Sequence, residues 1–152
     1  MKIISRSVKQ TINIGKQLAK RLKPGDIICL YGDLGSGKTV LTKGIAEGLG
    51  INQDKIISPT FVLIRSNPAK DKLTLHHFDL YRLKGCGDIL ALGLEEYFYS
   101  DGISVIEWAD RLGKLAPKEY LKVALSVKGD KIRWLEFKAS GKRHQELLEH
   151  WK

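Results

Sequence analysis

The amino-acid sequence predicts an α/β fold with three layers and a central sheet that mixes parallel and antiparallel strands. An apolar run at 26–31 leads into a glycine-rich loop and then into an amphipathic helix pattern. Strand and helix patterns alternate through much of the 152-residue chain. Two pairs of neighbouring strand patterns are joined by turns, and such hairpins add antiparallel strands to a sheet. The length fits one domain over residues 1–152.

The first predicted element is an amphipathic helix over residues 7–22. Ser7 stands at the position of an N-cap, where its side chain can satisfy a free backbone N–H. Apolar and small residues recur along one face at helical spacing. This face comprises Val8, Ile12, Gly15, Ala19 and Leu22.

A buried strand is predicted next, at 26–31, after the turn at 23–25. Its continuous apolar run suits a strand that is covered by helices on both faces. Beyond the glycine loop, Leu41, Ile45 and Leu49 recur at intervals of four residues, which is one face of a second helix. Gly50 stands where this helix should end.

Short strands and helices alternate in the rest of the chain. A short polar helix at about 143–151 is expected at the periphery of the domain. In order, the other predicted elements are a hairpin of strands 61–65 and 73–78 around a turn at 67–72, a helix at 88–98, a core strand at 103–106, and a hairpin of strands 121–127 and 132–137.

The composition is that of a globular protein, with 43% hydrophobic and 28% charged residues. No apolar run is long enough to span a membrane, and residues 1–6 lack the apolar stretch of a secretory signal. The chain has two cysteines, Cys29 in the predicted core strand and Cys86 in a glycine turn. They do not form the pattern of a disulfide framework, so we expect a cytoplasmic protein.

The net charge of +9 comes largely from lysines and arginines near both ends of the chain. A positive face can attract nucleic acid, including tRNA, or an acidic protein partner. Scattered lysines also keep a protein soluble without contacting any partner. The charge alone leaves both interpretations open.

The glycine-rich loop at 32–39 is the most specific chemical feature of the sequence. It reads Gly-Asp-Leu-Gly-Ser-Gly-Lys-Thr, which matches the phosphate-binding pattern G-x-x-x-x-G-K-[ST]. Its glycines let successive backbone N–H groups point at one anion, Lys38 adds a charge near the β- and γ-phosphates, and Thr39 can ligate magnesium. Together with the flanking strand and helix patterns, this loop predicts a P-loop NTPase-like fold. The predicted nucleotide-binding residues of this segment are Gly35, Ser36, Gly37, Lys38, Thr39 and Val40.

A magnesium site in such a fold needs a carboxylate at the end of a nearby core strand. Asp79 follows the predicted strand at 73–78, and Glu107 follows the one at 103–106. In open α/β sheets ligands bind at this carboxyl edge. Each acid can also simply end a strand or cap a helix, and the spacing does not tell which of the two holds metal.

His76 and His77 are adjacent in a predicted strand, so their side chains point to opposite faces and cannot chelate one ion together. Core or surface roles are expected for them. Trp108, which follows Glu107, can stack against a base, but packing within the protein is the simpler expectation.

Four segments taken in order closely resemble the bacterial TsaE (YjeE) family, over about residues 11–133. These are small P-loop ATPases needed to make threonylcarbamoyladenosine in tRNA. Beyond the glycine loop, the segments are Ser58-Pro59-Thr60-Phe61, His77-Phe78-Asp79-Leu80-Tyr81-Arg82-Leu83 and Ile106-Glu107-Trp108. Within the third segment, His77 has the family offset from Asp79.

The resemblance implies further roles. Thr39 and Glu107 would be the magnesium ligands, and Asp79 would act near the γ-phosphate of ATP. Residues 58–60 resemble a mobile switch-like segment, in which Thr60 would sense the γ-phosphate. Lys38, Asp79 and Thr60 would thus be the catalytic residues. Thr11 and, by a looser match, Arg133 resemble positions near the adenine.

The resemblance also implies partners. The family acts with the subunits TsaB and TsaD, of which TsaD carries out the transfer to tRNA, and the ATP cycle of TsaE is thought to reset that complex. The tail after about residue 140 matches nothing in the family pattern.

Three other functions share some of these features. A small-molecule or nucleoside kinase would have the same glycine loop, but no arginine-rich lid lies between 98 and 103. A GTPase is disfavoured because no Asn-Lys-x-Asp segment is present. A regulatory module that binds ATP and docks to partners or RNA, with very slow hydrolysis, is the alternative from a different class.

Overall fold

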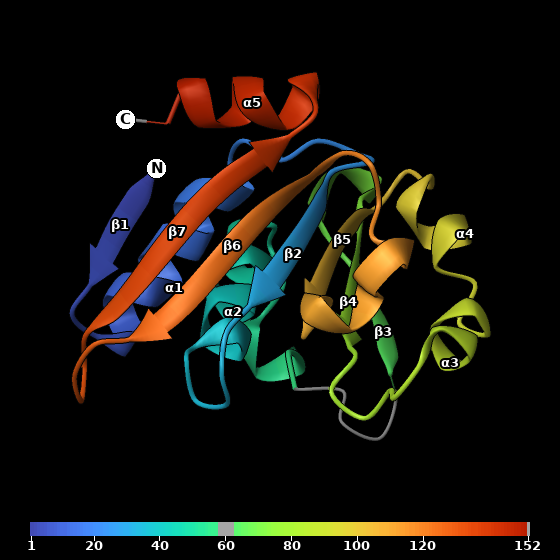
Figure 1. The fold of residues 1–152 in the computed structure, drawn as a ribbon. Coiled ribbons are helices and arrows are strands. Elements are labelled where there is room, and N and C mark those ends of the chain that lie inside the picture. Colours follow the sequence, from blue (N-terminus) through green and yellow to red (C-terminus); the bar gives the residue numbers. More distant parts are fainter. Residues whose placement is uncertain (58–62, 152) are drawn as a thin grey trace.

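The structure is a computed structural model that describes residues 1–57 and 63–151, and it contains a seven-stranded sheet (Figure 1). The strand order across the sheet is β1-β7-β6-β2-β5-β4-β3. The strands are β1 (Lys2–Ser5), β2 (Ile27–Tyr31), β3 (Ile64–Pro68), β4 (Thr74–Asp79), β5 (Ile103–Glu107), β6 (Tyr120–Val127) and β7 (Arg133–Ser140).

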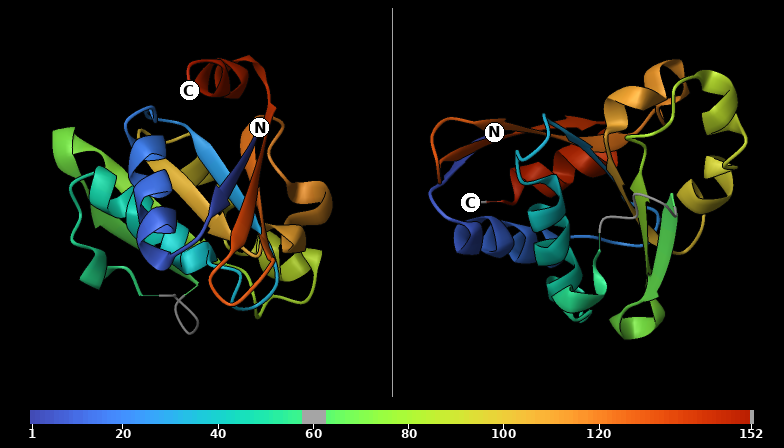
Figure 2. Two further views of the ribbon diagram at one scale, coloured as in Figure 1. Left: turned by 90° about the vertical axis from the view of Figure 1, so that its left-hand side faces the viewer. Right: turned by 90° about the horizontal axis from the view of Figure 1, so that it is seen from below.

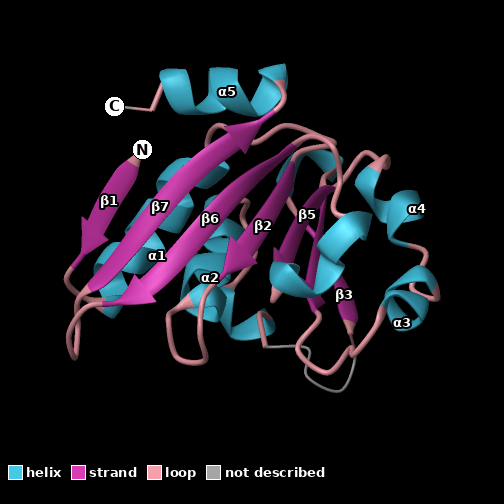
Figure 3. Cartoon of the chain, viewed as in Figure 1, coloured by secondary structure: helices cyan, strands magenta, loops and turns pink. Residues whose placement is uncertain are grey.

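The centre of the sheet is parallel and its edges are antiparallel, as the colouring by element makes easy to follow (Figure 3). Strand β2 pairs in parallel with β5 and β6, and β5 pairs in parallel with β4. The β3–β4, β6–β7 and β1–β7 pairs are antiparallel. The predicted mixed sheet and both predicted hairpins are therefore confirmed.

Helices cover both faces of this sheet (Figure 2). Residues of α1, α2 and α5 pack on one face, and those of α3, α4 and a 3₁₀ segment, η3, pack on the other. The predicted three-layer α/β fold is confirmed. The bounds are α1 (Val8–Ala19), α2 (Lys38–Gly48), α3 (Cys86–Leu90), α4 (Leu94–Phe98), α5 (Lys142–Glu149) and η3 (Ala109–Leu115), with shorter 3₁₀ turns η1 (Gln53–Lys55) and η2 (Lys70–Lys72).

Strand β2 connects the two cores. Ile28 and Leu30 join the core beneath α1 and α2, whereas Ile27 and Cys29 join the core beneath α3 and α4. All four side chains are buried. The uninterrupted apolar run is explained by this burial on both faces, as predicted.

Helix α1 forms within the predicted range of 7–22 but ends at Ala19, and Ser7 caps it by accepting a hydrogen bond from the backbone N–H of Gln10 at 3.1 Å. Part of its predicted buried face was wrong, because Val8 is 64% exposed. The face that packs on α2 is rotated relative to the expected one. Its buried residues are Thr11, Ile14, Gly15, Leu18 and Ala19.

Two glycines set the distance between α1 and α2. A β-carbon added at Gly15 would lie 2.6 Å from the carbonyl oxygen of Leu41, and one at Gly44 would collide with the backbone of Ile12. The helix backbones therefore touch at their crossing, which side chains larger than hydrogen would prevent.

Several boundaries differ from those predicted. The helix expected at 88–98 is interrupted, because Gly93 adopts a left-handed conformation with φ of 62° between α3 and α4. Strand β3 begins later than expected, and its predicted first residues, 61–62, lie outside the described residues. Strand β1 was not predicted, since its four residues are too few to show a periodic pattern.

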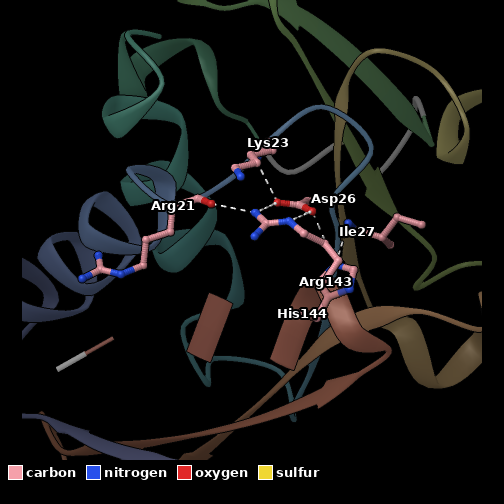
Figure 4. Close-up of polar contacts among 6 residues, drawn as sticks. All are labelled: Arg21, Lys23, Asp26, Ile27, Arg143 and His144. Atoms are coloured by element: carbon pink, nitrogen blue, oxygen red, sulfur yellow. Dashed lines mark hydrogen bonds and ion pairs between the residues drawn. The ribbon is translucent and has the colours of Figure 1, made fainter. Parts of the chain in front are cut away.

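The last helix, α5, is attached to the sheet by both apolar and polar contacts. Leu147 and Trp151 are buried, and the Trp151 ring packs edge-on against Phe137 with centroids 5.0 Å apart. At the first turn of α5, Arg143 forms an ion pair with Asp26, the residue before β2 (Figure 4). Among the described residues, the structure contains no helix with the length and apolar character needed to cross a lipid bilayer.

Candidate functional site

The glycine loop joins the end of β2 to the start of α2, at the carboxyl edge of the parallel strands. Gly35 and Gly37 have φ of 78° and 105°, a region that residues with a β-carbon rarely adopt. Gly37 is the N-cap of α2 and offers no side chain to the first turn. Free N–H groups and the helix dipole make such a terminus a site for an anion.

Lys38 lies inside this loop and is 5% exposed. Its ammonium donates to the carbonyl oxygens of Gly32 at 2.5 Å and Asp33 at 2.9 Å, and it lies 4.0 Å from the centroid of the Trp108 ring. Burial lowers the pKa of Lys38 from its ordinary value, while the carboxylate of Glu107 acts in the opposite direction. The loop thus holds a buried cation beside the N-terminus of α2.

Glu107 ends β5 and lies at the centre of a buried polar cluster. One carboxylate oxygen, Oε2, accepts a hydrogen bond from the Thr39 hydroxyl at 2.9 Å. The other, Oε1, contacts His77 Nε2 at 2.8 Å and the Thr42 hydroxyl at 3.3 Å. Glu107 is 2% exposed, and Thr42 and His77 are fully buried.

Asp79 ends β4 and pairs with Glu107 in the register of the two parallel strands. Its Oδ1 accepts a hydrogen bond from the backbone N–H of Tyr81 at 3.0 Å. Both acids face one cavity of about 330 Å³, together with the glycine loop and two aromatic rings. The lining residues are Leu34, Gly35, Gly37, Lys38, Thr39, Val40, Asp79, Tyr81, Glu107 and Trp108.

A second cavity, of about 540 Å³, lies on the other side of the loop. Thr11 and Arg133 both line it, although they are far apart in the sequence. The Thr11 hydroxyl shares a hydrogen bond of 2.8 Å with Ser5, and Arg133 Nη2 donates to the carbonyl oxygen of Gly35 at 3.3 Å. Gly35, Gly37 and Val40 line both cavities, so the loop separates them.

The structure therefore gathers nearly all of the sequence-predicted residues around one loop. Ser36 is buried, with its hydroxyl 3.5 Å from Lys38 Nζ. Thr60 and the segment around it, 58–62, lie outside the described residues. Trp108 packs against Tyr81, with ring centroids 4.8 Å apart, and it lines the cavity of the two acids rather than that of Thr11.

His77 and Thr42 are members of the site that the sequence analysis did not assign. The two neighbouring histidines do face opposite sides of the sheet, since His76 contacts Ser66 and Tyr97 whereas His77 contacts Glu107. The offset of two residues between His77 and Asp79 was the available signal, because alternate residues of a strand share a face. For Thr42, the signal was a polar residue on the buried side of the predicted helix.

The donor set fits magnesium. Thr39 and Glu107 present a hydroxyl and a carboxylate oxygen 2.9 Å apart, and magnesium prefers such oxygen ligands to nitrogen or sulfur. Across residues 1–57 and 63–151, no group of three or more His, Cys, Asp or Glu side chains is arranged to hold a metal. Magnesium is commonly held by one or two protein groups together with water and phosphate oxygens, so the two oxygens of Thr39 and Glu107 would suffice.

Comparison with known proteins places the chain among close relatives. The family model described as "Threonylcarbamoyl adenosine biosynthesis protein TsaE" matches residues 5–135. The tRNA threonylcarbamoyladenosine biosynthesis protein TsaE of Bacillus subtilis is 41% identical over 141 residues, which cover 93% of this chain and 87% of the relative. That of Treponema pallidum is 38% identical over 130 residues, covering 86% and 94%. The crystal structure of Bacillus subtilis YdiB matches with a TM-score of 0.82 and 37% identity, over 98% of this chain and 91% of the other.

Proposed function

The chain belongs to the TsaE family, and from this premise we propose that it is a magnesium-dependent ATPase subunit required for the threonylcarbamoyladenosine modification of tRNA. The relatives carry the name of that pathway. The observation that carries the ATPase part of the proposal is the arrangement of Lys38, Thr39 and Glu107. The glycine loop and the buried ammonium of Lys38 lie at the carboxyl edge of the sheet. The hydroxyl of Thr39 and the carboxylate of Glu107, whose oxygens suit a metal ion, lie at the same edge.

Each residue has a role in this proposal. The N–H groups of the glycine loop and Lys38 would bind the phosphates, and Thr39 and Glu107 would hold magnesium. Bound magnesium supplies neutralisation of the negative charge on the phosphate oxygens. Asp79 faces the same cavity and would orient the attacking water. Thr11 and Arg133 line the neighbouring cavity, which we assign to the adenosine moiety.

Positioning and charge neutralisation would carry the hydrolysis, because phosphoryl transfer requires little covalent participation by the protein. We further propose that the subunit acts in the cytoplasm with TsaB-like and TsaD-like partners. There its ATP cycle would reset the complex that transfers threonylcarbamoyl to tRNA. Hydrolysis by the isolated chain is expected to be slow.

ATP affinity in the presence and absence of magnesium tests the proposal most directly. The Lys38→Ala variant should lose ATP binding by at least about 100-fold, because a buried charge beside the phosphates is removed. Isothermal titration calorimetry on the full chain measures this affinity. Lys43→Ala, on the same helix, is the matched control and should bind as the wild type does.

Addition of the TsaB-like and TsaD-like subunits tests the proposed action within the complex. Phosphate release that rises when both partners are present, and co-purification that requires ATP, would support the proposed role. Phosphorylation of an added nucleoside or sugar would instead identify a kinase. ATP binding without phosphate release, even in a single turnover with the partners, would identify a regulatory module.

A further inference from the structure

His77 holds Glu107 by a contact that the proposed function does not yet use. Its imidazole is fully buried in β4, and Nε2 lies 2.8 Å from Glu107 Oε1. The Thr42 hydroxyl reaches the same oxygen at 3.3 Å. His77 is thus the closer of the two side chains at this carboxylate oxygen, while the other oxygen faces Thr39.

The hydrogen bonds also indicate which atom carries the proton. Oε2 of Glu107 accepts from the Thr39 hydroxyl, whereas the single hydrogen of the Thr42 hydroxyl has a nearer acceptor than Oε1, the carbonyl oxygen of Lys38 at 2.9 Å. His77 Nε2, at 2.8 Å, is the closer donor to Oε1. His77 Nδ1 is buried and has no hydrogen-bond partner within the part of the chain that the structure describes. A hydrogen on Nδ1 would be a buried donor without an acceptor, which is unfavourable, so we assign the ring hydrogen to Nε2, which faces Glu107.

We propose that His77 is a positioning residue that orients Glu107 for magnesium. Its contact with Oε1 fixes one oxygen of the carboxylate in place. Oε2 contacts the Thr39 hydroxyl, and these are the two oxygens that the proposed function assigns to the metal. This inference rests on the proposed function, because it concerns the approach of magnesium to Glu107.

Three variants separate positioning from a merely structural role. His77→Leu removes the donor but keeps an apolar side chain of similar size, and His77→Gln offers an amide N–H in its place. His76→Leu is the matched control, since His76 is the adjacent residue of the same strand and contacts Ser66 on the other face. The quantity to measure is the gain in ATP affinity on adding magnesium, relative to affinity in EDTA.

We expect His77→Leu to reduce this gain about 10-fold, because groups that orient metal ligands typically contribute this much to metal affinity. The affinity for ATP in EDTA should stay within about twofold of the wild type. His77→Gln should recover most of the gain, and His76→Leu should retain all of it. An equal loss of affinity with and without magnesium in His77→Leu would overturn the inference.

A measurement without any ligand keeps this inference distinct from the proposed function. Nitrogen-15 NMR of the imidazole rings in the free protein should show His77 as the Nε2–H form, with signals that shift in Glu107→Gln but not in His76→Leu. A His77 ring protonated on Nδ1 would overturn the inference. If wild-type ATP affinity did not respond to magnesium, the proposed function would fail, and the NMR result would still decide how His77 and Glu107 are paired.

Discussion

Two buried carboxylates lie toward opposite ends of β2, and their partners differ in kind. Asp26, just before β2, receives two hydrogen bonds from the Arg143 guanidinium, at 2.6 and 2.9 Å, and one from the backbone N–H of Lys23 at 2.8 Å (Figure 4). Glu107, opposite Leu30 near the other end of β2, contacts two hydroxyls and an imidazole.

Within residues 1–57 and 63–151, no lysine or arginine forms an ion pair with Glu107. Asp26 forms an ion pair with an arginine inside the fold, whereas Glu107 contacts two hydroxyls and an imidazole and interacts with the Lys38 ammonium only at longer range. Burial of an unbalanced charge is costly unless a counterion is supplied. The difference teaches that similar burial can serve two purposes: Asp26 attaches α5 to the sheet, and in the proposed function Glu107 would bind a cation supplied from outside the chain.

A histidine lies beside each carboxylate, and the contacts of the two histidines also differ. His77 Nε2 lies 2.8 Å from Glu107 and contributes to its orientation. His144 Nε2 accepts a hydrogen bond from the backbone N–H of Ile27 at 3.4 Å and is 3.9 Å from Asp26 (Figure 4). His144 therefore fills the space beside the Asp26–Arg143 pair without being the group that neutralises it.

The largest effect is expected for Glu107→Gln. Loss of the negative charge should lower magnesium-dependent ATP hydrolysis by at least about 100-fold, since the metal loses a charged ligand. The free energy of unfolding should change by less than about 1 kcal/mol or increase, because a buried charge that forms no ion pair with a lysine or arginine is removed. Phosphate release and urea denaturation measure the two quantities. Strong destabilisation with intact hydrolysis would make Glu107 a structural residue and break the comparison.

The converse pattern is expected for Asp26→Asn. This variant should lower the free energy of unfolding by about 2–3 kcal/mol, because Arg143 loses its counterion; the partial exposure of Arg143 moderates the cost. ATP affinity should stay within about twofold. Urea denaturation and calorimetry check both values. The exposed Lys16–Glu47 pair provides the control, since Lys16→Met should cost less than about 1 kcal/mol. Equal losses in the two variants would contradict the assigned role of Asp26.

The smallest effect concerns pH and His144. Burial lowers the pKa of His144 below its ordinary value, with Asp26 acting in the opposite direction. Between the ordinary pKa, about 6.5, and the lowered one, the unfolded chain binds a proton that the folded protein does not, so stability falls as pH decreases through that range. Above this range His144 has no such effect.

His144→Gln should flatten this decrease in the free energy of unfolding measured by urea titrations between pH 7 and pH 5. The pKa of His76 is also lowered by burial, so His76→Gln is the comparison that separates the two contributions. If His144→Gln left the pH dependence of the free energy of unfolding unchanged, a positive charge on His144 beside Arg143 would not be the cause of that dependence.

The features that could be predicted from sequence are those set by local pattern. The glycine loop, the apolar run of β2 and the acids at the ends of β4 and β5 each depend on neighbours along the chain. Thr11 and Arg133 were matched by resemblance alone, and they line one cavity because α1 and β7 both reach the loop.

Other features depend on packing between distant segments, which a local pattern does not record. The pairing of His77 with Glu107 requires the register of β4 on β5, and the exposure of Val8 depends on which side of α1 meets α2. The attachment of α5 was missed for the same reason: its arginine meets an aspartate that lies 117 residues earlier in the chain.

The backbone contact between α1 and α2 has a consequence for what the larger cavity can accept. Thr11 on α1 and Val40 on α2 line that cavity, and the two helices meet main chain to main chain at Gly15 and Gly44. The spacing of these two helices is therefore fixed by peptide geometry rather than by adjustable rotamers. The wall of the cavity that these helices form would therefore keep its place when the adenosine moiety of the proposed function binds.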